Sequence, residues 1–245
     1  MFGWFAPSCP CDPAAKRWME DRLKWLAKQF GLHILLEAPV ILPTAEFFPD
    51  PWDGSPKAVR RMFRRVCGYM HVNPDHMDLT LFDDKPFMDT MRAGTWQPSD
   101  TYGKSGSVHL DRGGVYRPAD LVGTMAHELA HQRLLGEGRF DPDTFDNELL
   151  TDLTAVYHGF GVFLANNPRK STGELGYWPG TKLFMPEYLS EPMLGYAMAH
   201  VAWFRDEEWP QWAKHLRWAP RAVFKQGLRY LQKTADSTFQ PVRLR

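Results

Sequence analysis

Apolar and polar positions along the N-terminal part of the chain predict two helices and a short strand. Apolar residues recur at helical spacing over residues 13–30, and Gly31 follows as a stop. A second helix is expected to begin with Ser55 as its cap and Pro56 in its first turn. The run APVILPT, residues 38–44, has the pattern of a short buried strand. The second helix should bury one apolar face, made of Val59, Met62, Phe63, Val66 and Met70.

Two further segments alternate between apolar and polar residues, as half-buried strands do. They are MDLTLF at residues 77–82 and SVHLDRG at residues 107–113. The stretch between them is rich in Gly, Ser, Asp and Pro, so we expect it to be a loop. Helices should follow at about 118–135 and 142–165.

These elements predict an α+β fold of one domain over residues 1–245. A small sheet belongs to the N-terminal part, about residues 1–135, and the remainder, about residues 136–245, is mostly helical. A Gly- and Pro-rich connection at residues 167–187 leads into the helical C-terminal third, where Pro220 opens the last helix. The chain has no internal repeat and no low-complexity tract, and we see no reason to divide it into independent domains.

The charge balance limits the classes of partner. Lys+Arg and Asp+Glu each total 29, so the formal net charge is zero. This argues against a dominant attraction to nucleic acid or to an anionic membrane. Four arginines cluster on the helix after Ser55, and both an anion-binding patch and a solvated helix face fit them. The zero net charge favours the solvated face for Arg60, Arg61, Arg64 and Arg65. The sequence contains no run of about 18 apolar residues, so it predicts no membrane-spanning helix.

The cysteines and the first residues indicate a reducing compartment. Cys9, Cys11 and Cys67 make an odd number, which does not suit a framework of disulfides. The start MFGWFAPSCPCDP lacks the basic region and the long apolar region of a signal peptide. A cytoplasmic location and free thiols are therefore the expectation, although a Cys-Pro-Cys pair can also bind a metal or carry a lipid.

The segment TMAHELAHQ, on the helix expected at 118–135, brings two imidazoles together. His127 and His131 are four residues apart, so on a helix they share one face with their Cβ atoms about 5–6 Å apart. That spacing lets both rings bind one Zn²⁺ at about 2.0–2.1 Å. Glu128 lies about 100° further round the helix, beside the metal. From there its carboxylate can act as a general base on a zinc-bound water.

The next predicted helix supplies a third ligand. It is expected to start with Asp141 as its cap and Pro142 in its first turn, which puts Glu148 and Asp152 one turn apart on one face. Glu148 completes a His₂Glu site with one position open for water. Asp152 is placed to accept the second N–H of a ligating imidazole. His158 lies about 80° away from Glu148 round the helix, so we expect a structural or surface role for it.

HELAH followed by ELLTD resembles the gluzincins, the thermolysin-like clan of metallopeptidases, whose pattern is HExxH followed by ExxxD. The resemblance implies a zincin-like fold, one zinc ion per chain, Glu148 as a zinc ligand and Asp152 as the support of a histidine ligand. The longer stretch ELLTDLTAVYHGFGVFLAN also resembles a group of uncharacterised bacterial proteins that share the HELAH arrangement over much of the chain. That closer likeness implies no particular substrate.

The clan resemblance also implies a Tyr or His from a later helix that donates to the oxyanion formed when water attacks an amide. Tyr196 and His200 lie one turn apart on one helix face and are the candidates. A buried pair satisfied by ordinary hydrogen bonds is the alternative. The clan further implies a strand before the HExxH helix whose edge pairs with an extended peptide. Residues 107–113 are the candidate, with His109 in a structural role.

Two hypotheses of function follow. In the first, the chain is an intracellular zinc peptidase that acts on peptides or proteins, and Glu128 passes the water's proton to the leaving amine. In the second, it is a zinc-bound scaffold or binding protein that keeps the fold without cleaving. A scaffold does not need a carboxylate at position 128, so Glu128 favours the enzyme. A protease that associates with DNA through the arginine cluster is a third hypothesis.

Overall fold

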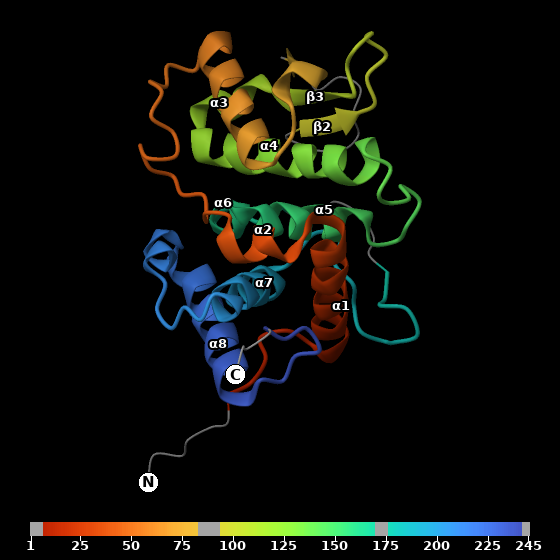
Figure 1. Ribbon diagram of the computed structural model, residues 1–245, viewed down its shortest axis with the longest axis vertical. Helices are drawn as coiled ribbons and strands as arrows, with labels where there is room; N and C mark the ends of the chain where they lie inside the picture. Colours follow the sequence, from red (N-terminus) through yellow and green to blue (C-terminus); the bar gives the residue numbers. More distant parts are fainter. Residues whose placement is uncertain (1–6, 83–93, 170–175, 242–245) are drawn as a thin grey trace.

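The computed structural model describes residues 7–82, 94–169 and 176–241. These residues are mostly helical and include a small sheet, which confirms the α+β class (Figure 1). None of their helices combines the length and the apolar character needed to cross a membrane.

The strands are β1 Met77–Phe82, β2 Gly94–Gln97 and β3 Gly106–Asp111. The α-helices are α1 Pro13–Phe30, α2 Leu32–Glu37, α3 Pro56–Tyr69, α4 Pro118–His131, α5 Asn147–Ala155, α6 Gly161–Asn166, α7 Glu191–Phe204 and α8 Trp218–Thr234. Shorter 3₁₀ or π-helical turns are η1 Pro74–His76, η2 Arg112–Tyr116, η3 Gln132–Gly136, η4 Val156–Phe160 and η5 Gln211–His215.

Side-chain caps explain why α1 and α3 begin where the sequence predicts. Asp12 Oδ1 accepts hydrogen bonds from two backbone N–H groups of the first turn at 2.9 and 3.0 Å, so α1 begins at Pro13. Ser55 Oγ accepts from a backbone N–H of the first turn of α3 at 3.2 Å. The predicted apolar face of α3 is buried, except that Met62 is only partly buried.

β3 is the central strand of the sheet, because it pairs parallel with β1 and antiparallel with β2. The expectation that residues 107–113 offer an edge to a peptide is therefore wrong, since both edges of β3 are occupied. β3 ends at Asp111, whose side chain accepts from the N–H of Gly113 at 3.0 Å and starts the turn η2. β2 falls in the stretch predicted to be a loop, of which residues 83–93 lie outside the described part. In the described part, β2 is an edge strand.

The elements stack in layers that put α4 between the sheet on one side and α5 and α6 on the other. α4 contacts β2 and β3 on one side and α5 and α6 on the other. In Figure 1, α3 lies beside α4, and α2, α7 and α8 lie beyond α5 and α6. α1 and α2 contact α7, so these N-terminal helices pack with the C-terminal helices rather than with the sheet. Buried hydrophobic residues from the whole stack form one cluster.

The strand expected at residues 38–44 is wrong, because this segment packs against a helix kink instead of a sheet. The N–H of Ile41 donates to the carbonyl of Gly159 at 2.9 Å. Gly159 has φ 96°, a left-handed conformation that favours glycine, and a Cβ atom there would collide with the Pro39 carbonyl oxygen. The helix expected at 142–165 is consequently broken at Gly159, between α5 and α6.

α5 also begins later than predicted, at Asn147. Asp141 does not cap a helix: its Oδ1 accepts from the N–H of Asp143 at 3.0 Å, and its carbonyl accepts from the N–H of Thr144 at 3.2 Å. These bonds close a turn. As a result, Glu148 lies in the first turn of α5.

The arginines of α3 bind acceptors close to them. Arg65 lies 2.7 Å from Asp50, and Arg64 lies 2.8 Å from Asp75. Arg61 donates to the carbonyl of Pro51 at 3.2 Å. Two of the four cations, Arg64 and Arg65, are thus paired with carboxylates at the surface, which agrees with a solvated helix face at these two positions.

His158 is expected to make the fold sensitive to acid. The side chain is buried, its Nδ1–H donates to the Thr154 carbonyl at 2.9 Å, and burial lowers its pKa to about 3. An unfolded histidine titrates near pH 6.5, so at lower pH the unfolded chain gains a proton that the folded chain does not bind. Stability is therefore lost as the pH falls below about 6.5. His200, whose pKa burial lowers to about 4, acts in the same direction.

We expect His158→Gln to reduce the slope of unfolding free energy against pH between pH 6 and pH 4. The reduction should reach up to about 1.4 kcal/mol per pH unit, because one titrating group is removed. Urea unfolding of both proteins at matched metal content measures the two slopes. Equal slopes would show that His158 is not held neutral in the folded protein.

Candidate metal centre

The candidate ligands meet where α4 and α5 pack together. His127 and His131 lie on the last turns of α4, with their ring centroids 4.9 Å apart. Glu148 comes from the first turn of α5, which packs against α4. The i, i+4 spacing on α4 and the packing of α5 thus bring the three predicted ligands to one place.

The separations of the Glu148 oxygen from the two imidazole nitrogens fit one tetrahedral metal ion. Glu148 Oε2 lies 3.1 Å from Nε2 of His127 and 3.6 Å from Nε2 of His131. Two atoms that bind one zinc at 2.0–2.1 Å with tetrahedral geometry are about 3.3 Å apart. The ligand atoms of all three residues lie within 4.8 Å of one another. Among the described residues, no other group of three or more His, Cys, Asp or Glu side chains is this close. Two imidazoles and one carboxylate are the donor set of many zinc sites that keep an open position.

Hydrogen bonds on the far side of each ring select the nitrogen that faces the metal. His127 Nδ1 lies 2.8 Å from Asp152 Oδ1, and a carboxylate only accepts, so Nδ1 carries the proton. Thr151 Oγ1 donates to the Asn147 carbonyl at 2.8 Å and is 3.2 Å from His131 Nδ1. The hydroxyl proton is engaged, so Thr151 accepts from His131 Nδ1–H. Both histidines therefore present Nε2 to the cluster.

The electrostatics of the cluster suit a cation. Burial raises the pKa of Glu148, but the hydrogen bond with His127 and the nearby ring of His131 outweigh this effect and hold the pKa far below its usual range. Burial and the charge of Arg169 lower the pKa of His127, yet hydrogen bonds to Asp152 and Glu148 raise it by more. The carboxylate is thus ionised and favours a proton on the His127 imidazole, and a bound metal would replace that proton.

A cavity of about 200 Å³ opens beside the cluster and is lined by Glu128 as well as by the three candidate ligands. Glu128 is 3% exposed, and it follows His127 on α4, beside the candidate ligands as the helical spacing predicts. The rest of the wall comes from β2, α5 and the segments that follow α4 and α6 or precede α7. Its residues are Gly94, Thr95, Trp96, Leu135, Asn147, Arg169 and Tyr188.

β2 approaches α4 closely because it begins with glycine. A Cβ atom at Gly94 would lie 2.7 Å from Thr124 Cγ2 and 3.2 Å from Glu128 Cγ. Such contacts would displace the strand or the Glu128 side chain. Trp96 stacks over His131, with a ring separation of 6.5 Å, and its indole N–H donates to Gln132 at 2.9 Å. β2 therefore forms one wall of the metal cavity.

The structure does not bring Tyr196 and His200 to the metal cavity. The Tyr196 hydroxyl donates to Glu20 at 2.8 Å, and His200 is 3.1 Å from the Tyr196 carbonyl and 3.0 Å from Ser237 Oγ. Both side chains are buried, and neither lines the cavity. α7 contacts α1 and α8, so the face that holds this pair points into the helical core. These contacts agree with the packing alternative, and we assign the oxyanion role to neither residue.

Other candidate ligands also lie outside the cluster. His158 packs edge-on against Phe30 at a ring separation of 5.0 Å, in agreement with a structural role. His109 Nε2 is 3.1 Å from Ser107 Oγ on β3. Cys9 and Cys11 are free thiols, as expected, and neither belongs to a three-ligand group among the described residues.

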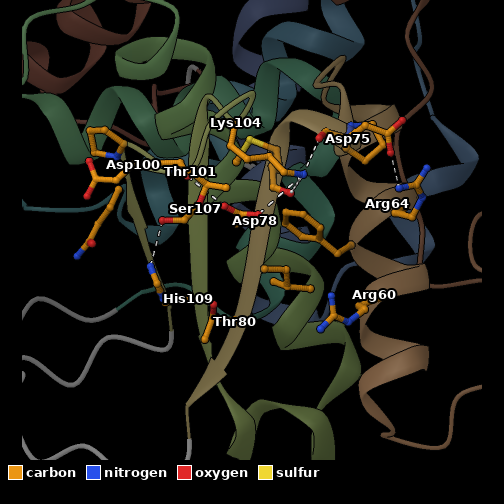
Figure 2. Close-up of a pocket in the computed structure, with 17 residues that line it drawn as sticks. Arg60, Arg64, Asp75, Asp78, Thr80, Asp100, Thr101, Lys104, Ser107 and His109 are labelled. Atoms are coloured by element: carbon orange, nitrogen blue, oxygen red, sulfur yellow. Dashed lines mark hydrogen bonds and ion pairs between the residues drawn. The ribbon is translucent and has the colours of Figure 1, made fainter.

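A larger cavity, about 830 Å³, lies on the other face of the sheet (Figure 2). It is lined by the polar side chains of β3 that alternate with the buried ones. Around it, Arg64 pairs with Asp75 at 2.8 Å and Lys104 lies 3.8 Å from Asp78. Cations and carboxylates thus neutralise each other there, and the cavity contains none of the clustered metal ligands.

Thr151, Arg169 and Tyr188 are among the residues of the site that the sequence-based prediction does not contain. Thr151 had a usable signal, because it lies three residues after Glu148 and shares its helix face. Arg169 and Tyr188 lie in the connection between α6 and α7, part of which, residues 170–175, is outside the described part. They reach the cavity through the course of that connection, which no periodic pattern encodes.

Comparisons with protein-family models, with curated proteins and with solved structures found no match. The gluzincin resemblance therefore rests on the motif residues alone.

We expect one zinc ion per chain, bound through the three clustered side chains. His127→Ala, His131→Ala and Glu148→Ala should each lower the zinc content, because each removes one protein ligand. Metal analysis of the purified proteins measures the content. Full occupancy in all three variants would contradict the site.

Losing either buried hydrogen-bond acceptor should weaken zinc binding without removing a ligand. Asp152→Ala and Thr151→Val leave His127 and His131, respectively, without a fixed orientation, so affinity should fall by roughly 10–100-fold. Competition with a chromogenic chelator measures it. Asp141→Asn, at the surface turn before α5, is the control and should bind zinc as the native chain does. Unaltered affinity in both test variants would show that neither partner supports the metal.

Proposed function

We propose that this protein is a zinc-dependent metallopeptidase of the gluzincin type. The supporting observation is that three candidate ligands with zinc-like separations share one cavity with a buried carboxylate that is not a ligand, Glu128. A metal site with a purely structural role would be closed by a fourth protein ligand and would have no use for Glu128. The three-ligand set with an adjacent carboxylate is what hydrolysis requires.

In this proposal, His127, His131 and Glu148 hold the zinc. When bound, zinc supplies Lewis-acid chemistry, in that it polarises a carbonyl and makes a water molecule more acidic. Glu128 accepts the proton of the attacking water and delivers it to the leaving amine. Asp152 and Thr151 hold the ring orientations on which ligand geometry depends.

The substrate in this proposal is an extended peptide that pairs with β2. The strand is an edge strand in the described part of the chain, and its residues from Gly94 to Trp96 line the metal cavity. A peptide added to this edge passes the cluster with its main chain held by hydrogen bonds. Such binding selects extended segments of a protein or peptide and depends little on their side chains.

We expect Glu128→Gln to abolish turnover while zinc stays bound. Glutamine has nearly the same volume but cannot accept the proton of the attacking water, so the rate should fall by about 10²–10⁴-fold. The loss should appear in kcat, with peptide affinity largely kept. A peptide-library cleavage assay on the zinc-loaded native chain identifies substrates, and the variant is then measured on them beside Asp141→Asn as a control.

A zinc-loaded native chain that cleaves nothing in the library and captures the same peptides as Glu128→Gln would refute the enzyme. The zinc-bound scaffold would then be the better description of the protein.

Backbone methylation of a substrate peptide should test its pairing with β2. In an antiparallel pair only every second residue directs its N–H to the partner strand. Single N-methyl groups should therefore weaken binding to the Glu128→Gln variant at alternate positions, by about tenfold where a hydrogen bond is lost. Calorimetric titration of each methylated peptide measures the affinity. A loss that does not alternate would contradict strand pairing.

A further inference from the structure

Arg169 reaches the metal cavity from the segment that follows α6. Its Nη2 atom lies 3.6 Å from Glu128 Oε1, and its guanidinium carbon is 5.8 Å from the centre of the Tyr188 ring. The side chain is 17% exposed. Among the described residues that line the cavity, Arg169 is the only lysine or arginine. A permanent cation therefore stands next to the proposed general base.

The cavity wall contains a residue with a buried donor atom and one with a buried acceptor atom, and neither atom makes a hydrogen bond. Arg169 Nη2 is buried and makes no hydrogen bond, since 3.6 Å to Glu128 is beyond hydrogen-bond range. Asn147 Oδ1, from the first turn of α5, is also buried and makes no hydrogen bond. Burying such atoms without a hydrogen bond is energetically costly. A ligand that pairs with both would remove that cost.

A peptide group has the complementary chemistry, because it offers one carbonyl oxygen and one N–H. Arg169 and Asn147 line the same cavity as Glu128 and the candidate metal ligands. When water attacks the amide carbon, negative charge develops on the carbonyl oxygen, and a fixed cationic donor in a water-poor cavity stabilises that charge strongly. Among the described residues that line the cavity, Arg169 is the cationic donor. Tyr196 and His200 make their hydrogen bonds outside the cavity.

We propose that Arg169 is a catalytic residue that donates hydrogen bonds to the oxygen of the scissile carbonyl, and that Asn147 positions the substrate by accepting from one of its N–H groups. This inference rests on the proposed peptidase function. The water oxygen bonds to the carbonyl carbon, its proton goes to Glu128, and the carbonyl π electrons move onto the oxygen that Arg169 binds. The C–N bond then breaks as the carbonyl re-forms, and the amine nitrogen takes the proton from Glu128.

Substitutions at Arg169 should reduce turnover more than substrate binding. We expect Arg169→Gln to lower kcat by about 10²–10³-fold, the usual cost of losing an oxyanion donor, with KM and zinc content nearly unchanged. Arg169→Lys keeps a cation and should recover part of that loss. Asn147→Ala should instead raise KM and leave kcat within a few-fold.

Arg117→Gln is the matched control. Arg117 also lies near a carboxylate, 3.5 Å from Asp120, but it is 74% exposed and does not line the cavity. Its loss should leave both kinetic constants and zinc content unchanged.

Binding of a tetrahedral anion gives a second readout that does not depend on turnover. A peptide phosphonamidate, with the sequence of the cleaved substrate, carries negative oxygens where the carbonyl oxygen would be. Its affinity should fall by about 10²-fold in zinc-loaded Arg169→Gln. The uncleaved peptide should bind equally well to Glu128→Gln and to the double variant Glu128→Gln/Arg169→Gln. A structural role for Arg169 would weaken both ligands together and would overturn the inference.

The remaining outcomes also decide between the inference and its rivals. If Arg169→Gln raises KM at constant kcat and removes a preference for free over amidated peptide C-termini, Arg169 recognises a terminal carboxylate and the oxyanion role is wrong. If the native chain cleaves peptides and Glu128→Gln does not, the peptidase function is supported. An unchanged kcat in Arg169→Gln would then contradict the role of Arg169 without contradicting the peptidase function. A native chain without cleavage activity overturns both.

Discussion

The buried contact between His127 and Asp152 is the interaction on which the site depends. Asp152 accepts from the His127 ring at 2.8 Å through one oxygen and from the N–H of Leu189 at 3.0 Å through the other. It thereby joins α4, α5 and the segment that leads into α7. Burying charged groups costs several kcal/mol per ion unless hydrogen bonds satisfy them. Any shift of α5 along α4 would break these bonds, so the helix packing and the ligand geometry are fixed together.

Glycines and one tryptophan determine the shape of the opposite wall. Gly94 lets β2 lie against α4 beside Glu128, and Gly106 on β3 leaves room for the hydrogen bond between Trp96 and Gln132 at 2.9 Å. Larger residues at either glycine would push the strand outward. The resulting cavity has a volume of about 200 Å³. The same close packing leaves Arg169 beside Glu128, so charge and shape act on the same small volume.

The elements that the sequence predicted well depend on local interactions. Asp12 and Ser55 cap α1 and α3 through bonds to their own first turns, and such bonds can be read from neighbouring residues. The failures depend on distant contacts. The apolar run at residues 38–44 packs against the helix kink at Gly159, where the N–H of Ile41 donates to the Gly159 carbonyl, and does not join a sheet. β2 is only four residues long and begins with Gly, so it has too little alternation to be recognised before its partner strand is known.

For the site, helical spacing by itself determined that His127 and His131 share a face and that Glu148, Thr151 and Asp152 lie within one turn and a half of each other. These relations need only the 3.6-residue period of one helix. Spacing could not determine which way a whole helix face points. Tyr196 and His200 share a face as well, but α7 turns that face into the core. Only the tertiary structure showed which faces meet, which strand lies at the edge, and that Arg169 reaches Glu128. Those arrangements come from packing between residues far apart in the chain, where burial of the entire apolar surface, and not any local preference, decides the outcome.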